Sequence, residues 1–240
     1  MEKDNALTPF YIQLREIIRY KIESGEYAPC TMIPSENEMA DEYAVTRQTV
    51  RNAVDTLINE GLLRRVAGKG VFVLGRGIDR DLEVLQGFTK TMLERNMVPS
   101  VKVLKKSTRT AGAKYAMMFG IAPEDEIFYV KRMCYGNNEP VSLEEIYVPK
   151  NLVPKIDGID LSVFSMTEVY EMYGIRLEQA RQTIDMVHME QNDANQLGIT
   201  TQTPVILFEC TSYDEAGRII ELSRSYTRGD KGRFLVHFRR

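Results

Sequence analysis

Residues 34–73 have the sequence PSENEMADEYAVTRQTVRNAVDTLINEGLLRRVAGKGVFV, and this stretch decides the fold of the first part of the chain. Ser35 and Thr46 each precede a run of apolar residues with helical spacing. Glu38 lies three positions after Ser35 and completes a capping box. The pattern therefore predicts a short helix, a tight turn and a longer helix that ends at Gly61.

The flanking residues add a helix before this pair and a hairpin after it. Apolar residues recur every three or four positions from Tyr11 to Ile22, which predicts a helix over residues 8–24. Residues 62–73 hold two β-prone stretches around the tip 67–70, whose two glycines accept positive φ angles. The predicted order is three helices followed by a two-stranded hairpin.

The charge of the chain is unevenly distributed. A formal net charge of −3 argues against nucleic-acid binding when the chain is taken as a whole. Between residues 47 and 76, however, six basic residues stand against two acidic ones, a local balance of +4. These residues are Arg47, Arg51, Arg64, Arg65, Lys69 and Arg76 against Asp55 and Glu60. Such a basic face indicates DNA binding, and a solvated surface is the alternative.

Polar residues of the longer predicted helix suit DNA recognition. Arg47, Gln48 and Arg51 lie off its apolar stripe, near the N-terminal end. A recognition helix presents side chains to base edges in the major groove from this position. Thr49 is placed to reach a phosphate, and Lys69 at the hairpin tip to reach the minor groove or the DNA backbone. We therefore predict DNA contacts here, with simple solvent exposure as the alternative.

Over residues 8–74 the chain resembles the winged helix-turn-helix of GntR-type bacterial regulators, and the stretch quoted above carries this resemblance. The DNA-facing positions that the resemblance implies are Ser35, Glu36, Arg47, Gln48, Thr49, Arg51, Lys69 and Gly70. Asn37 departs from the pattern, because many relatives carry a DNA-contacting arginine there. The departure implies a different operator sequence, and Asn37 is not among the predicted contacts.

The predicted hairpin is followed by a polar segment at residues 76–81, which indicates a linker. The linker separates a predicted DNA-binding domain at residues 1–75 from a second domain at residues 82–240. No internal repeat is visible in either part.

The second domain alternates predicted helices and strands. Helices are predicted near residues 82–95, 111–119, 166–173 and 190–197, and strands near residues 101–109, 127–135, 141–148, 175–187, 205–213, 219–227 and 234–238. Turn-forming residues at 136–138 and 214–217 predict short loops, which favour antiparallel pairing. The expected class is α+β, with an antiparallel sheet and helices in the second domain.

Charged residues lie inside several of these predicted strands. They are Arg132, Glu144, Glu221, Arg224 and Arg228. Burying a charge without a partner is costly, so side chains that point inward are expected to pair with each other or with a ligand. The alternative is that they lie on the solvent face of the sheet, and their alternation does not decide between the two.

Residues 82–240 resemble the effector-sensing UTRA domain of the HutC branch of the GntR family, which is similar to the chorismate lyase fold. The matching motifs are LQGFTKTMLERNMVP at 85–99, the strand of Arg132, LEEIYVP at 143–149 and SRSYTRGDKGRF at 223–234. The resemblance implies a cleft for a sugar phosphate, an amino-acid derivative, an organic acid or a related metabolite. The effector-binding positions that it implies are Phe88, Thr89, Arg132, Glu144, Ser165, Thr167, Glu221 and Thr227.

Each implied position has a chemical role. Phe88 and Thr89 fall at the start of a predicted helix, where backbone N–H groups bind anions. Arg132 would supply a countercharge, while Glu144 and Glu221 would accept hydrogen bonds from hydroxyl or amino groups. The polar contacts from a second helix start and from the cleft wall would come from Ser165, Thr167 and Thr227.

Four positions depart from the sugar-phosphate sensors of this family. Cys134 stands in place of a second arginine, and Thr167, Thr227 and Gly232 stand in place of tyrosines. Losing a guanidinium removes a bidentate phosphate partner. The first candidate effector is a phosphorylated sugar or a sugar–amino acid conjugate, and the second is a non-phosphorylated polar metabolite.

Three functions remain open at this point. The first is a homodimeric repressor that a metabolite releases from a near-palindromic operator, because a two-fold protein requires two-fold related half-sites. The second is a chorismate-lyase-like enzyme, against which the isolated His188 and His237 and the lack of a catalytic motif argue. The third is an effectorless DNA-binding dimer.

Cellular location and cofactors follow from composition. The chain shows neither a signal peptide nor an apolar run of membrane-spanning length, so we expect a cytoplasmic protein without a membrane partner. Cys30, Cys134 and Cys210 lack the spacing of a zinc site or of a disulfide framework. We expect no metal, no cofactor and no catalytic residue.

Overall fold

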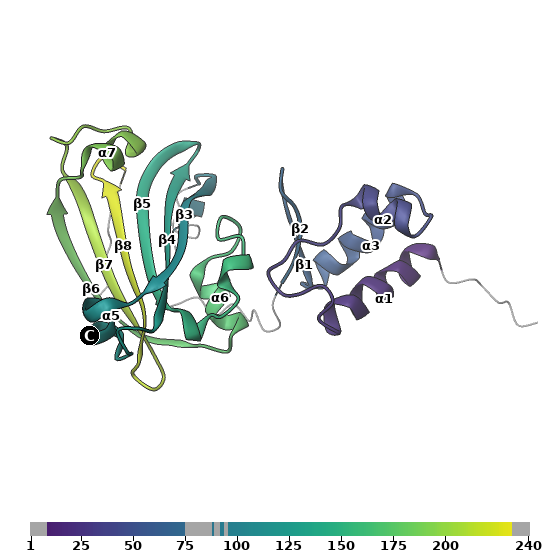
Figure 1. Ribbon diagram of the computed structural model, residues 1–240. Coiled ribbons are helices and arrows are strands. Elements are labelled where there is room, and N and C mark those ends of the chain that lie inside the picture. Colours follow the sequence, from purple (N-terminus) through teal and green to yellow (C-terminus); the bar gives the residue numbers. More distant parts are fainter. Residues whose placement is uncertain (1–8, 75–87, 89–91, 94–95, 232–240) are drawn as a thin grey trace, which may run out of the picture. The chain divides into compact units, whose positions relative to one another are not determined.

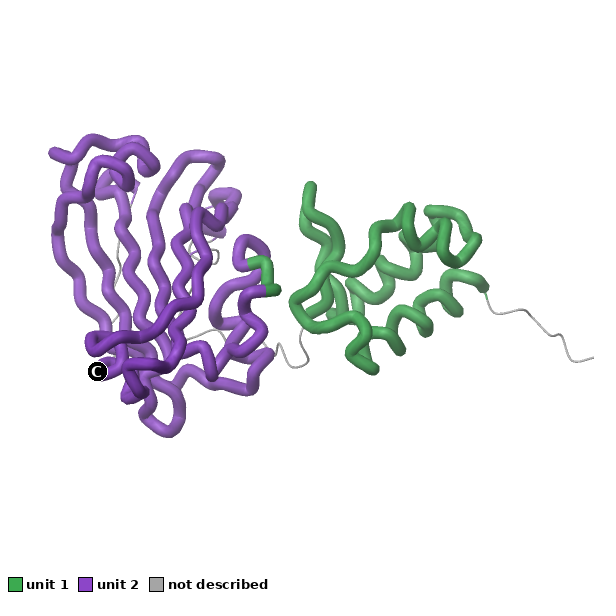
Figure 2. The backbone as a smooth tube through the Cα atoms, in the orientation of Figure 1, with its two compact units in different colours: residues 1–78, 158–160 green, residues 79–157, 161–240 purple. Residues whose placement is uncertain are grey.

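A computed structural model describes the protein at residues 9–74, 88, 92–93 and 96–231 (Figure 1). The chain divides into two compact units, residues 1–78 with 158–160 and residues 79–157 with 161–240 (Figure 2). The predicted linker at residues 76–81 lies outside the described residues.

The first unit is built from three helices and a hairpin. The helices are α1 (Phe10–Glu23), α2 (Glu36–Glu42) and α3 (Arg47–Asn59), and the hairpin strands are β1 (Leu63–Val66) and β2 (Gly70–Val73). This is the order that the sequence predicts, and it is a winged helix-turn-helix with the hairpin as its wing. The core includes the buried Leu14, Ile18, Ile33, Met39, Val50, Val54, Leu57 and Leu63.

Side-chain caps fix where α2 and α3 begin. The Ser35 hydroxyl accepts a hydrogen bond from the Glu38 N–H at 3.2 Å, and the Glu38 carboxylate accepts one from the Ser35 N–H at 2.7 Å. The Thr46 hydroxyl accepts a hydrogen bond from the Thr49 N–H at 3.2 Å. These bonds satisfy N–H groups that have no partner inside the helix. The predicted capping box and the predicted second cap are therefore confirmed.

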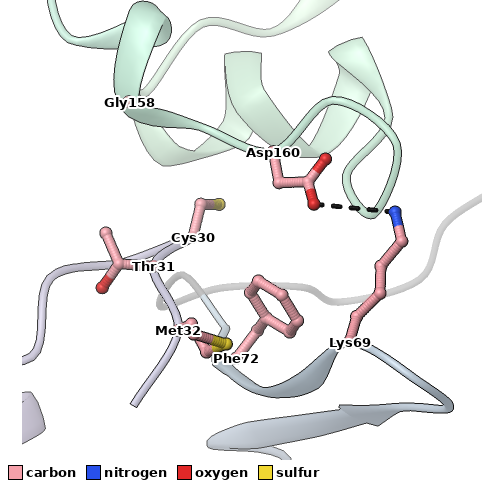
Figure 3. A pocket seen from close by; sticks show the side chains of 7 residues that line it. All are labelled: Cys30, Thr31, Met32, Lys69, Phe72, Gly158 and Asp160. Carbon is pink, nitrogen blue, oxygen red and sulfur yellow. Dashed lines mark ion pairs between the residues drawn. The ribbon is translucent and has the colours of Figure 1, made fainter. Parts of the chain in front are cut away.

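The wing is held from both sides. Strand β2 pairs with β1 in antiparallel register from Leu63 opposite Val73 to Val66 opposite Gly70. On its other side, the Ile33 N–H donates to the Val71 carbonyl at 2.9 Å. Met32 forms a bridge with Phe72, and Figure 3 shows the two side chains next to each other. The segment before α2 thus ties the wing to the helices.

The second unit is a single antiparallel sheet with helices. Its strands follow the order β3-β4-β5-β8-β7-β6. They are β3 (Pro99–Thr110), β4 (Glu126–Gly136), β5 (Glu139–Pro149), β6 (Leu177–Val187), β7 (Val205–Asp214) and β8 (Ile219–Arg228). The β4–β5 turn contains Asn137 and Asn138 at φ angles of 51° and 65°, which suit a tight hairpin. The predicted α+β class is confirmed.

Helices lie on both faces of this sheet. Helix α5 (Gly112–Phe119) packs on Ile127, Tyr147 and Leu222, and α7 (Gln191–Leu197) packs on Met133, Leu143 and Val205. Figure 1 shows α5 and α7 at opposite ends of the sheet. Helix α6 (Met166–Met172) contacts the other face through Tyr170, which bonds to Glu221. We call this second surface the α6 face.

The predicted helix at residues 82–95 and the predicted strand at residues 234–238 lie almost entirely outside the described residues. Phe88, Met92 and Leu93 are described, and all three are helical. The short 3₁₀ segments Lys150–Leu152 and Ile156–Gly158 were not expected. They lie between β5 and α6, where the chain has no long apolar periodicity.

The two wing glycines allow a matched test of the hairpin. At Gly70, φ is +122°, and an added Cβ would lie 2.8 Å from the Met32 Sδ, whereas Gly68 has φ +72° and open space. An alanine at φ +72° costs about 1–2 kcal/mol, but φ +122° is a region that essentially only glycine adopts. Gly70→Ala is expected to speed hydrogen exchange of the Ile33 amide about tenfold more than Gly68→Ala does. Equal exchange rates in the two variants would contradict the described wing geometry.

Candidate functional site

A cluster of arginines surrounds one carboxylate at the start of α2. The Glu36 carboxylate accepts hydrogen bonds from Arg51 at 2.8 Å, from Arg65 at 3.1 Å and from Arg47 at 3.3 Å. Arg47 and Arg51 come from the first turns of α3, and Arg65 comes from β1. A second acid, Asp55, accepts a bond from Arg65 at 2.6 Å. These ion pairs connect helix α3 with strand β1 of the wing.

The carboxylate and its arginines differ in exposure. The Glu36 side chain is 14% exposed, whereas those of Arg47 and Arg51 are 61% and 43% exposed. Hydrogen bonding from Arg51, followed by that from Arg47, lowers the pKa of Glu36 despite its partial burial. Glu36 therefore stays ionised and orients the guanidinium groups, whose outer N–H groups remain open to solvent. Such forked donors suit bidentate binding to phosphate oxygens or to guanine.

The other residues predicted to contact DNA lie at the helix starts and in the wing. Ser35 caps α2, while Gln48 and Thr49 lie in the first turn of α3. The Gln48 amide donates to Asn52 at 2.8 Å, and the Thr49 hydroxyl lies 2.9 Å from that of Thr46. The other place is the wing, where Lys69 is exposed and Gly70 begins β2.

Arg65 is a residue of this cluster that the sequence analysis counted as basic but did not place at the site. One signal was available. Asp55 follows Arg51 by four positions, so the two side chains lie on one side of α3. An arginine on the adjacent strand could have been paired with this acid.

The second cluster lies on the α6 face of the sheet. Arg132 of β4 lies opposite Glu144 of β5, and its Nε donates to the Glu144 carboxylate at 2.8 Å. Its Nη1 lies 3.4 Å from the carbonyl oxygen of Leu161. The side chains of Arg132 and Glu144 are only 12% and 15% exposed. The expectation that strand charges would pair is confirmed for these two residues.

A third charge, Glu221 of β8, is buried in the same surface. Its carboxylate accepts a hydrogen bond from the Tyr170 hydroxyl at 2.6 Å. Burial raises the pKa of Glu221, and burial followed by the nearby Glu221 charge raises that of Tyr170 well above its usual range. The sequence analysis missed Tyr170, although a tyrosine on the apolar side of the predicted helix 166–173 signals a buried hydroxyl that needs a partner.

Two short side chains extend this cluster along the sheet. Cys134 of β4 lies opposite Ser142 of β5, which lies opposite Thr227 of β8. All three are buried. Burial raises the pKa of the Cys134 thiol well above its ordinary value, so the thiol stays protonated.

The effector-binding positions predicted at the two helix starts are only partly described. Ser165 is the N-cap of α6, and its hydroxyl and N–H both donate to the Glu168 carboxylate, at 2.9 and 2.7 Å. Thr167 is half-buried in the first turn of α6. Phe88 is half-buried and helical, while Thr89 lies outside the described residues.

The structure thus brings Arg132, Glu144, Glu221 and Thr227 onto one face. Carboxylates and hydroxyls of this kind bind the hydroxyl and amino groups of small polar molecules. Within the described residues, no group of three or more His, Cys, Asp and Glu side chains could hold a metal ion. None of the helices described is long and apolar enough to cross a membrane.

A winged helix with exposed arginines on its recognition helix, together with a sheet domain that carries a buried polar cluster, defines a class of protein. The class is the DNA-binding transcription regulators. Two family models match the chain: "Bacterial regulatory proteins, gntR family" at residues 10–73 and "UTRA domain" at residues 94–233. The protein belongs to the GntR family and to its UTRA-containing branch, as the sequence motifs predict.

Relatives of known description support this assignment. The HTH-type transcriptional repressor NagR of Bacillus subtilis is 31% identical over 232 residues, which cover 96% of this chain and 94% of NagR. The probable fructoselysine utilization operon transcriptional repressor of Escherichia coli K12 is 25% identical, over 92% of this chain and 91% of that protein. The crystal structure of PhnF from Mycobacterium smegmatis has the same fold, with a TM-score of 0.62 and 22% identity over 96% of this chain and 99% of PhnF.

Replacing Glu36 tests its role in the arginine cluster. Glu36→Gln removes the negative charge that accepts hydrogen bonds from three arginines. The same charge would repel DNA phosphates. We expect operator affinity to fall about tenfold while affinity for unrelated DNA rises, because nonspecific binding follows net charge. Glu23→Gln, an exposed residue of α1, makes the same charge change away from the cluster and serves as the control. A parallel rise in both affinities would show that Glu36 acts only as a charge.

The buried Glu221 predicts a specific pH dependence of stability. A folded-state pKa above the unfolded value of about 4.3 means that stability is complete below that value and is lost as pH rises through the folded pKa. Glu221→Gln keeps an oxygen that accepts the hydrogen bond from Tyr170. Because glutamine does not ionise, the variant does not lose stability as pH rises. Urea unfolding should therefore show the variant gaining stability over the parent between pH 4 and pH 8.

Glu139 is the control for this experiment. Hydrogen bonding from Lys231 lowers its pKa, so its contribution is present at high pH and is lost as pH falls. Glu139→Gln should therefore lose stability relative to the parent as pH rises. A Glu221→Gln variant with the same trend as Glu139→Gln would contradict a raised pKa at Glu221.

Proposed function

We propose that the protein is a homodimeric repressor that binds a near-palindromic operator and is released by a small sugar-derived metabolite. DNA binding is inferred chiefly from one observation: the Glu36 carboxylate accepts hydrogen bonds from Arg47, Arg51 and Arg65. In this proposal α3 enters the major groove, and Arg47 and Arg51 contact base edges. Lys69 and Gly70 of the wing contact the DNA backbone or the minor groove.

The effector part of the proposal draws on the α6 face and on the relatives. Two of the similar proteins are named for sugar-type compounds, the fructoselysine repressor and the mannosyl-D-glycerate system repressor MngR of Escherichia coli K12. Carboxylates such as Glu144 and Glu221 accept hydrogen bonds from sugar hydroxyl and amino groups. Thr227 and Ser165 would add hydroxyl contacts, with Phe88, Thr89 and Thr167 at the remaining predicted positions.

The contacts of this cluster favour an effector without a phosphate. Arg132 already has Glu144 as its partner, and the N–H of Ser165, the N-cap of α6, already donates to the Glu168 carboxylate. Cys134 offers no second positive charge. We therefore place a non-phosphorylated sugar or sugar–amine conjugate first and its phosphorylated form second, which reverses the order that the family resemblance gave.

The proposal does not include catalysis. The enzyme alternative needs a reactive group in the same cluster, and two candidates there, the Cys134 thiol and the Tyr170 hydroxyl, are poor nucleophiles. Burial raises the pKa of the Cys134 thiol and of the Tyr170 hydroxyl, so both stay protonated near neutral pH.

Fluorescence anisotropy with the DNA upstream of the protein's own gene tests the function. We expect specific binding that weakens with salt and is reversed by one member of a panel of sugars, amino sugars and their 6-phosphates. The effector weakens operator binding because it binds more tightly to the state of the protein that does not fit the operator. The resulting loss of operator binding free energy is typically about 1–3 kcal/mol.

Two neighbouring residues of β5 supply matched variants for this assay. Glu144 lies in the α6-face cluster, whereas Glu145 points to the opposite face and accepts a hydrogen bond from Tyr129 at 2.7 Å. Once circular dichroism shows both variants folded, Glu144→Gln should bind the operator normally and lose its release by effector, while Glu145→Gln should keep both. Binding without release by any compound would leave an effectorless DNA-binding dimer, and no specific binding at any salt would refute the regulator.

A further inference from the structure

Strand β3 carries a row of positive charge along one edge of the described sheet, where only β4 pairs with it. Lys102 lies opposite Met133 of β4, which packs against α7. Arg109 lies opposite Ile127 of β4, which packs against α5. Lys105 lies between them in the same register, so all three side chains are on the face of the sheet that carries α5 and α7.

These three side chains are exposed, and so is that of Lys114 in the first turn of α5. We call Lys102, Lys105, Arg109 and Lys114 the basic strip. Residues 97–123, which contain the strip, hold five basic residues and no acidic one. None of the four makes an ion pair with a residue that the structure describes. The strip thus presents four positive charges to solvent.

The cations of the inner strands differ from the strip, because they have acidic partners. On the same face of the sheet, Lys131 of β4 donates to the Asp193 carboxylate at 2.7 Å. Arg224 of β8 donates to the Glu209 carboxylate at 2.7 Å. A surface that gathers charge of one sign raises the local concentration of ligands of the opposite sign. The basic strip is therefore a candidate binding surface for an anion.

Lysine on an outer strand also has a structural role, because it discourages pairing with other strands. This role does not account for Lys114, which lies on a helix. The Lys114 Nζ lies 5.6 Å from the centre of the Tyr115 ring, and the Arg109 guanidinium carbon lies 5.4 Å from the same centre. Cation–π contacts hold both groups at one end of the strip, although like charges repel each other. An anion bound at this end would offset the repulsion.

The spacing of the strip suits an extended polyanion. Lys102 and Lys105 lie opposite residues two positions apart on β4, and Lys105 and Arg109 lie opposite residues four positions apart. At about 3.4 Å per residue, the row from Lys102 to Arg109 is about 20 Å long. A stretch of this length on one DNA strand carries about six phosphates. A small anion would contact only one end of such a row.

We propose that the basic strip is a second DNA-binding surface, which contacts phosphates of the DNA that the first unit binds. This inference rests on the proposed DNA-binding function and adds a contact from the second unit. Phosphate contacts add affinity without reading sequence, and Ser107, on the same face between Lys105 and Arg109, adds a hydroxyl donor. Because the first unit holds the same DNA, the strip meets the phosphates at a high effective concentration.

The salt dependence of operator binding tests the strip. Affinity for an operator duplex with flanking DNA on both sides is measured by fluorescence anisotropy between about 50 and 200 mM salt. The full parent chain is compared with Lys102→Gln/Lys105→Gln. Each lost phosphate contact removes about 0.9 from the slope of log affinity against log salt, so the slope should become about 1.8 shallower for each protomer bound. Operator affinity at the lowest salt should fall about tenfold.

Lys155→Gln/Arg176→Gln is the matched control, since it removes two exposed positive charges from the same unit outside the strip. Its slope should equal that of the parent. A strip variant with the parent's slope would overturn the inference. An equal change in both double variants would also overturn it, because net charge alone would then explain the effect.

Two further measurements separate the remaining outcomes, once circular dichroism shows all chains folded. Sedimentation velocity detects edge protection, because a strip variant that self-associates and keeps the parent's slope would assign the lysines to that role and overturn the inference. A parent that binds no operator at any salt would refute the proposed function, and the strip with it. Operator binding by the parent with equal slopes in all variants would refute the strip alone.

Discussion

A guanidinium buried in the middle of a β-sheet has to find a negative partner, and the second unit is organised around this constraint. Arg132 is buried opposite Glu144, and a further acid, Glu221, is buried with Tyr170 as its hydrogen-bond donor. The same strand register that pairs these side chains on one face of the sheet places apolar residues on the other face, where α5 and α7 pack. Breaking a buried pair on one side costs about 3–5 kcal/mol, so fold and candidate site constrain each other.

Local structure could be predicted from the sequence because its causes are local. Ser35 and Thr46 cap the helices that follow them, and Asn137 and Asn138 supply the positive φ angles of a hairpin. The candidate site was predicted only in part. Arg65 and Tyr170 were missed because their partners, Glu36 and Glu221, lie far away in sequence. Which face of a strand is buried depends on the helices packed on it, and strand alternation alone does not contain that information.

One cross-strand row of side chains connects the effector cluster with the edge of the sheet. Arg132 and Glu144 belong to one cross-strand row that continues through Ser225 and Phe208 to Ile184 of β6. The effector cluster and the β6 edge are therefore parts of one continuous surface of the sheet. A ligand bound at the cluster would contact this row, and allostery requires that such contacts differ between two states of the protein.

The central claim is that a two-fold protein places two arginine-bearing recognition helices on DNA, and hydroxyl-radical footprinting on the DNA upstream of the protein's own gene tests it most directly. The account predicts two protected half-sites with inverted sequence, centred roughly one helical turn (about 10 base pairs) or a multiple of it apart. In the Arg47→Ala variant, both half-sites should lose protection together. Protection of a single half-site, or uniform protection that does not depend on sequence, would contradict the account.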